Sequence, residues 1–138
     1  MTTPMTPSTP TTPTTPTTII RTASELPLPF SKAVEAGGFI FLSGQIPMER
    51  DGRPARGSIE EQTVNVLESI AATLAQLGSA MEDVVRVTVW ISDLALFGRF
   101  NEVYRGYFKE PHLPARSTVQ AKLAYDVDIE IEATACRT

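Results

Sequence analysis

The sequence predicts an α+β domain in which a single mixed β-sheet carries two helices on one face. Short segments with strand-like alternation occur near both ends of the chain and in its middle. Two longer segments repeat apolar residues at helical spacing. The order is strands, helix, strand, helix, strands, which is typical of helices packed on one sheet. The length of 138 residues, 42% of them hydrophobic, suits one domain with a single core.

The first half of this domain is expected to contain a strand, a hairpin and a helix. Residues 17–22, "TTIIRT", predict a short strand, and "AVEAGGFIFLSGQI" predicts two strands that turn at Gly37-Gly38. An S-x-x-E capping box that begins at Ser58 predicts the start of a helix. Apolar residues at three- and four-residue spacing extend this helix over 59–77, and a glycine follows.

The second half predicts a strand, a helix and two final strands. In "VVRVTVWIS" we expect one apolar row, formed by Val85, Val87, Val89 and Ile91. Asp93 stands where a helix N-cap belongs, and the helix is expected over 94–109. The strand-helix-strand passage over 84–123 predicts a right-handed crossover, which would make its two strands parallel.

Composition excludes several kinds of chemistry. The 12 basic and 16 acidic residues give a formal charge of -4, which disfavours nucleic acid as a partner. Cys136 is the only cysteine and His112 the only histidine, which argues against internal disulfides, Cys/His zinc sites and Ser-His or Cys-His dyads. We therefore expect no metal and a chemistry based on carboxylates, arginine, hydroxyls and the backbone.

The N-terminal segment is expected to lie outside the domain. Residues 1–18 are almost entirely Thr and Pro, with proline at every third position from 4 to 16, which favours a polyproline II or disordered tail. A Pro-rich docking ligand is the alternative, but basic and aromatic neighbours are missing. Neither a secretory leader nor an apolar run of about 20 residues is present, so we expect a cytoplasmic protein that does not span a membrane.

Two charged residues in the final strands raise a question about function. Arg116 and Glu130 fall on the polar rows of "ARSTVQAKL" and "DIEIEATA", and we expect these rows to share the sheet face that the helices leave uncovered. On a wet face they would be solubilising residues or an ion pair worth ~0–1 kcal/mol. In an oligomer they would line a partly desolvated cleft. The pattern alone leaves both interpretations open.

Four motifs, in order, resemble the RidA family of small reactive-intermediate deaminases, also called the YjgF family. They are "AGGFIFLSGQIP" at 36–47, "VVRVTVWISDLALFGRFNEVY" at 84–104, "PARSTV" at 114–119 and "DIEIEATA" at 128–135. The resemblance covers 19–138. It implies a chorismate-mutase-like fold, assembled as a homotrimer with a central β-barrel and three clefts between subunits.

The resemblance also implies an activity and the residues that perform it. Members hydrolyse enamines and imines of 2-amino acids, such as 2-aminoacrylate and 2-iminobutanoate or 2-iminopropanoate, to 2-keto acids and ammonia without a cofactor. By this resemblance Arg116 binds the substrate carboxylate, Glu130 positions or activates water, and the backbone N–H of Thr118 helps to hold the carboxylate. Bidentate hydrogen bonding suits a guanidinium to the first role.

Further residues are assigned to the pocket wall by the same resemblance. Ser43 and Gly44 match its "SGQ" segment, and Asn101 matches the asparagine of "N-x-x-Y". Phe30 stands where many members have tyrosine, and Thr118 where many have cysteine, so the substrate is less defined than the reaction. Alternatives are a non-catalytic trimer that binds a small carboxylate, an RNA-cleaving or translation-inhibiting relative, and a deaminase dedicated to one pathway, such as aminomuconate or aminoacrylate chemistry.

Overall fold

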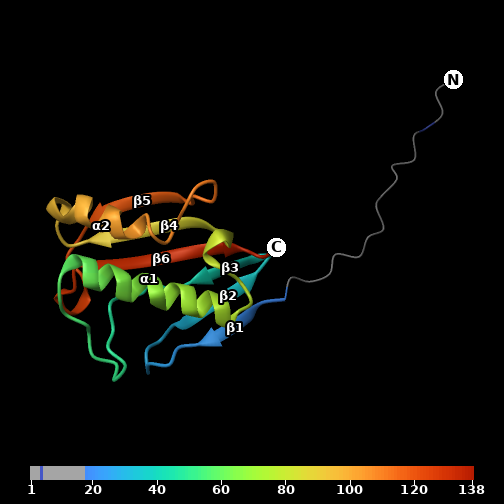
Figure 1. Cartoon of the computed structure of the whole chain (residues 1–138). Helices are drawn as coiled ribbons and strands as arrows, with labels where there is room; N and C mark the ends of the chain where they lie inside the picture. The colour runs from blue at the N-terminus through green and yellow to red at the C-terminus, as the bar shows by residue number, and fades with distance from the viewer. Residues whose placement is uncertain (1–3, 5–17) are drawn as a thin grey trace.

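The computed structural model describes residue 4 and residues 18–138, which form a six-stranded sheet with two helices on one side of it (Figure 1). The predicted tail over 1–18 therefore lies outside the described residues, except for residues 4 and 18. The strands are β1 (Ile20–Ala23), β2 (Ser31–Ala36), β3 (Phe39–Leu42), β4 (Val84–Ile91), β5 (Ala115–Gln120) and β6 (Ile129–Cys136), and the helices are α1 (Ile59–Gln76) and α2 (Phe97–Tyr104).

The strands lie in the order β1-β2-β3-β6-β4-β5. All neighbouring pairs are antiparallel except β4 and β5, which are parallel and connected through α2, as the crossover prediction required. The hairpin between β2 and β3 turns at Gly37 and Gly38, both with positive φ, which confirms the predicted turn. The last strand of the chain, β6, thus lies in the middle of the sheet.

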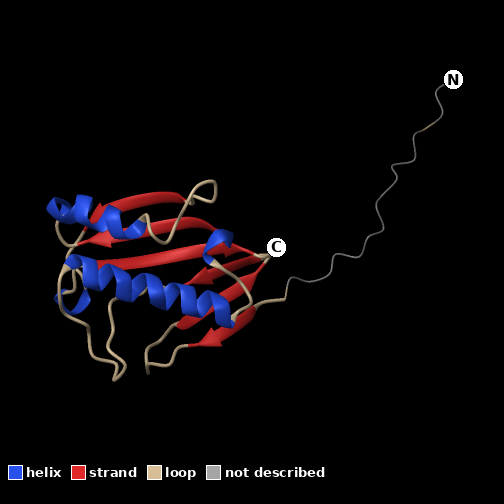
Figure 2. Cartoon of the chain, viewed as in Figure 1, coloured by secondary structure: helices blue, strands red, loops and turns tan. Residues whose placement is uncertain are grey.

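Figure 2 shows both helices on the same side of the sheet. Beneath α1 the buried residues of β6 are Ile129, Ile131, Ala133 and Ala135, which join the helix residues Val66, Leu67, Ile70 and Leu74 in one apolar core. The opposite face is open. Phe39 and Phe41 of β3 are 41% and 45% exposed on it, although a large aromatic side chain usually contributes to a core or an interface.

One predicted apolar row is wrong at its first residue. Val84, Val87, Val89 and Ile91 are buried, whereas Val85 is 43% exposed. The register between β4 and β6 shifts between Val84 and Arg86, so the chain contains a β-bulge at this point. The extra residue reverses the alternation on its N-terminal side, and Val84 takes the buried position instead of Val85.

The second helix is shorter than predicted. Asp93 does act as a cap, since its side chain accepts a hydrogen bond from the N–H of Ala95 at 2.9 Å, but residues 94–96 form a 3-10 turn. The α-helix ends at Tyr104 because the N–H groups of Gly106 and Tyr107 bond to carbonyls only three residues back. The described residues contain no helix that is both long and apolar enough to cross a membrane.

The capping box of α1 gives a direct stability prediction. The hydroxyl of Ser58 accepts from the N–H of Glu61 at 3.1 Å, and the Glu61 carboxylate accepts from the N–H of Ser58 at 3.5 Å. Ser58→Ala should lower the free energy of unfolding by about 1 kcal/mol, measured by urea denaturation at one protein concentration. Ser58→Thr keeps the hydroxyl acceptor and should retain most of the wild-type free energy of unfolding. Equal losses of this free energy in both variants would contradict the capping explanation.

Candidate active site

Arg116 lies beneath α2, on the face of the sheet that the helices cover. Its neighbour on β4 is Val87, which is buried. The guanidinium carbon lies 5.6, 5.5 and 4.6 Å from the ring centroids of Phe97, Phe100 and Tyr104. A guanidinium at these distances is attracted to the ring faces. The side chain is half-buried, and within the described residues no ion pair or side-chain hydrogen bond neutralises it.

Two hydroxyls near Arg116 are also without partners. The oxygens of Tyr104 and Thr118 are buried and have no hydrogen bond among the described residues. Burial raises the pKa of Tyr104, and Arg116 opposes this effect through its positive charge and through a weak donor contact to the hydroxyl that falls short of full hydrogen-bond geometry. Asn101 belongs to the same turn of α2 as Phe100 and Tyr104, and it is half-buried. Arg116 and Thr118 therefore form one group under α2, and Asn101 lies on the helix that covers them.

Glu130 lies on the opposite, open face. Its neighbour on β4 is Trp90, and its carboxylate lies against the backbone of Gly44. A Cβ on Gly44 would be 2.3 Å from Glu130 Oε2, so only glycine leaves room for the carboxylate there. Backbone hydrogen bonds of 2.8 and 3.0 Å between Gln45 and Ile131 hold the two segments together. Burial, and secondarily the charge of Glu132, raise the pKa of Glu130.

The remaining predicted residues lie with Glu130. The hydroxyl of Ser43, the residue before Gly44, donates to the carbonyl of Ser31 at 2.6 Å. Phe30 directly precedes Ser31, and its ring is 48% exposed. Ser43, Gly44 and Glu130 thus form a second group, at the start of the loop that follows β3. Phe30 adjoins it through the bond from Ser43 to Ser31, and the loop places a backbone wall against one carboxylate.

The expectation that Arg116 and Glu130 share a face is wrong. The parallel register places Arg116 beside Val87 and Thr118 beside Val89, both buried under the helices. The polar row of β5 therefore faces α2, where aromatic rings cover it, and Val119 is on the open face. Since Glu130 faces the other way, the sheet separates the two charges within one chain.

A polar network that the sequence analysis missed fixes the start of β6. Gln62 is buried on α1, and its amide donates to Asp128 Oδ2 at 2.9 Å and accepts from the Asp128 N–H at 2.8 Å. The Ser92 hydroxyl donates to Asp128 Oδ1 at 2.6 Å. These bonds connect α1, the end of β4 and the residue two before Glu130. Only the sequence separation of 66 residues hid the Gln62–Asp128 pair.

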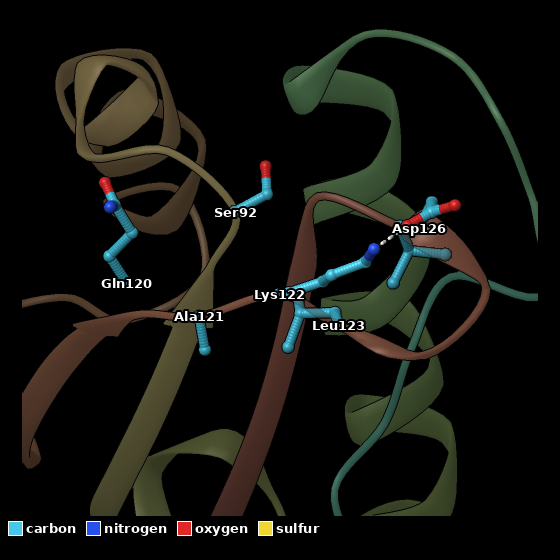
Figure 3. Close-up of a pocket in the computed structure, with 7 residues that line it drawn as sticks. Ser92, Gln120, Ala121, Lys122, Leu123 and Asp126 are labelled. Carbon is cyan, nitrogen blue, oxygen red and sulfur yellow. Dashed lines mark ion pairs between the residues drawn. The ribbon is translucent and has the colours of Figure 1, made fainter.

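Two hollows in the described surface lie away from both groups. One of about 410 Å³ lies beyond the end of β5 and includes Gln120, Lys122 and Asp126 (Figure 3). Lys122 extends toward Asp126, with their charged groups 4.0 Å apart. Another of about 570 Å³ lies between α1 and residues 106–112. Neither contains a residue that the sequence analysis assigned to the site.

A protein family, curated relatives and solved structures are all similar to this chain over most of its length. The family described as "Endoribonuclease L-PSP" matches residues 22–137. A RutC family protein of Pyrococcus abyssi is 47% identical over 109 residues, which are 78% of this chain and 85% of the relative. Mitochondrial protein MMF1 of Saccharomyces cerevisiae is 39% identical over 107 residues, 77% and 73% of the two chains. The structure of a putative endoribonuclease from Thermotoga maritima has a TM-score of 0.76 at 45% identity, covering 80% of this chain and 88% of that one.

The pKa of Glu130 predicts a pH-dependent stability. Because the folded-state pKa lies above the ordinary 4.5, folding favours the protonated carboxyl, and this stabilisation is lost as the pH rises through the folded pKa. Glu130→Gln should therefore raise the free energy of unfolding at pH 7, with a gain that vanishes below pH 4.5. Urea denaturation of the wild type and the variant, at several pH values from 7 to below 4.5, measures this difference in the free energy of unfolding.

The neighbouring carboxylate supplies the control for this measurement. Since Glu132 contributes to the raised pKa of Glu130, the gain from Glu130→Gln should be smaller in a Glu132→Gln background. A wild-type protein more stable than Glu130→Gln at pH 7 would show that another interaction outweighs the cost of burying this charge.

Proposed function

This chain belongs to the endoribonuclease L-PSP family, the YjgF/RidA family that its motifs resemble, and from this premise we propose that it hydrolyses reactive enamines and imines of 2-amino acids. The proposed substrates are of the 2-aminoacrylate and 2-iminobutanoate or 2-iminopropanoate type, and the products are 2-keto acids and ammonia. The observation that carries the proposal is the half-buried guanidinium of Arg116, which has no counter-ion among the described residues.

Arg116 is proposed to bind the substrate carboxylate. A buried cation without a partner is costly, and an anionic ligand removes that cost. The planar guanidinium offers two parallel N–H donors to a carboxylate, and it stays charged at every working pH. The surrounding rings of Phe97, Phe100 and Tyr104 leave the outer edge of the guanidinium as the part available to an anion.

Glu130 is proposed to transfer the protons of the hydrolysis. Its carboxylate takes a proton from water as the water oxygen bonds to the imine carbon, and the C=N double bond becomes a single bond. The proton then passes to nitrogen, which gives a carbinolamine. Glu130 next transfers the carbinolamine hydroxyl proton to the nitrogen, the C–N bond breaks as the C=O bond forms, and the 2-keto acid and ammonia leave. A raised pKa suits this exchange, because the group must both accept and donate a proton near neutral pH.

The two groups are proposed to meet across a subunit boundary. Arg116 and Glu130 face opposite sides of one sheet, so a site that contains both requires a second chain. The homotrimer with a central β-barrel that we propose would cover Phe39 and Phe41 on the open face. It would also place the Arg116 group of one chain beside the Glu130 group of the next. We propose a cytoplasmic location, although relative MMF1 is named mitochondrial.

RNA cleavage is the second candidate, because the family description and the Thermotoga maritima structure both carry the word endoribonuclease. The net charge of -4 gives little attraction to a phosphate backbone. A non-catalytic trimer that binds a small carboxylate would also use Arg116. Turnover separates these functions: deaminase activity releases ammonia, nuclease activity shortens RNA, and a binding protein does neither.

Arg116→Ala tests the proposed reaction. An amino-acid oxidase generates the imine in the assay, and ammonia release is compared with and without the protein. Loss of two charge-assisted hydrogen bonds should reduce kcat/KM at least about 100-fold. Arg116→Lys keeps the charge without the bidentate geometry and should retain part of the activity. A wild-type rate no higher than that of Arg116→Ala would contradict the proposal, and the same preparations are assayed for RNA cleavage.

Mixed trimers test the shared site. Arg116→Ala and Glu130→Gln chains are each expected to be inactive alone, but a site that takes Arg116 from one chain and Glu130 from its neighbour is intact at some boundaries of a mixed trimer. Random co-assembly of equal amounts should restore about a quarter of the wild-type activity. Co-expression followed by an activity measurement provides the test. A mixture as inactive as its components would show that no site combines Arg116 of one chain with Glu130 of another.

A further inference from the structure

We propose that the hydroxyl of Tyr104 is a further substrate-binding group, which donates a hydrogen bond to the carboxylate that Arg116 holds. The inference rests on the proposed function, since it concerns the same anion. Its basis is a buried polar atom that has no full hydrogen bond to any residue the structure describes.

The contacts of Tyr104 place its hydroxyl at the Arg116 group. The residue is 7% exposed, and its ring centroid is 5.5 Å from that of Phe100 and 4.6 Å from that of Phe108. The Arg116 guanidinium carbon is 4.6 Å from its own centroid, the shortest of the three cation–π distances. The Arg116 guanidinium lies close enough to the hydroxyl to favour its ionised form as a weak donor, but the distances and angles of a full hydrogen bond are not met by any described residue. A phenylalanine would fill this packing position without that defect.

An unpartnered buried hydroxyl destabilises the free protein, so its presence calls for a partner that residue 4 and residues 18–138 do not supply. Thr118, two residues after Arg116 on the same face of β5, has the same defect. Two hydroxyls without a full hydrogen bond, and one guanidinium without a counter-ion, thus lie near one another in the described part of the chain. All three groups donate hydrogen bonds, and a carboxylate offers about four acceptor positions on two oxygens.

The protonation state of Tyr104 suits a donor. Burial raises its pKa above the ordinary 10.0, so the hydroxyl keeps its proton throughout the neutral range. Ring faces hold the guanidinium, and no salt bridge among the described residues restrains it. The proposal requires that an anion bound to the guanidinium also lies within hydrogen-bond distance of the Tyr104 hydroxyl.

Tyr104→Phe provides the test, with pyruvate, the 2-keto acid product of 2-iminopropanoate, as the probe. Titration calorimetry on the full-length protein should show pyruvate binding weakened about tenfold or more, as expected for a lost hydrogen bond to a carboxylate. The thermal midpoint of the free variant should rise, since the unpaired hydroxyl is gone. In the ammonia assay KM should rise by a similar factor while kcat changes little.

Tyr107→Phe is the matched control, three residues further along. Its hydroxyl donates to Glu68 Oε1 at 2.7 Å, with its pKa raised to about 12, and it lies away from Arg116. This variant should lose stability and bind pyruvate normally. Thr118→Val, which keeps the backbone N–H, should raise the thermal midpoint as Tyr104→Phe does.

The outcomes separate the two proposals. Unchanged pyruvate affinity in Tyr104→Phe, with wild-type binding intact, overturns the role of Tyr104 and leaves the deaminase proposal standing. Weakened binding in Tyr104→Phe, with no ammonia release by the wild type, supports Tyr104 and overturns the deaminase proposal. Wild-type protein that neither binds pyruvate nor releases ammonia overturns both. A lower thermal midpoint in Tyr104→Phe also contradicts the inference, because it would show that the hydroxyl is satisfied within the protein.

Discussion

The alternation of side chains along β6 is the constraint on which the rest of the structure depends. This strand lies between β3 and β4, with Ile129 and Ile131 buried beneath α1. Because successive residues face opposite sides, Glu130 must point to the open face, and a slip of one residue would place it in the core. The Gln62–Asp128 hydrogen bonds prevent such a slip at the start of the strand. The site geometry thus follows from how the core is packed.

Each chain keeps two charged groups partly out of water and does not pair them with each other. Aromatic faces compensate Arg116, which cation–π attraction does only in part. Glu130 has no cationic partner among the described residues, and burial and the charge of Glu132 raise its pKa. In the proposed assembly, a bound carboxylate would pair with Arg116 and a second chain would cover the Glu130 face, and each would compensate one of these charges. This is the physical link between the fold, in which the sheet separates the charges, and the assembly proposed to unite them.

Features determined by neighbouring residues could be predicted from the sequence, and features determined by distant residues could not. The Ser58 cap, the Gly37-Gly38 turn and the parallel crossover depend on local pattern and chain direction, and all three were predicted correctly. The bulge at Val85 was hidden because Val84 and Val85 are both valine, so either fits the buried row. The face of Arg116 was predicted wrongly because its row reads as polar, while the aromatic rings that cover it belong to α2.

Gly44 has a consequence for how this chain can change during evolution. Its backbone forms the wall against Glu130, and any larger residue there would displace the carboxylate. A substitution at this position would therefore move the Glu130 carboxylate as well as change the surface around it. The exposed ring of Phe30 is under no such constraint, since it is not packed in the core. Change at Phe30 is thus expected to leave the carboxylate in place, whereas change at Gly44 is not.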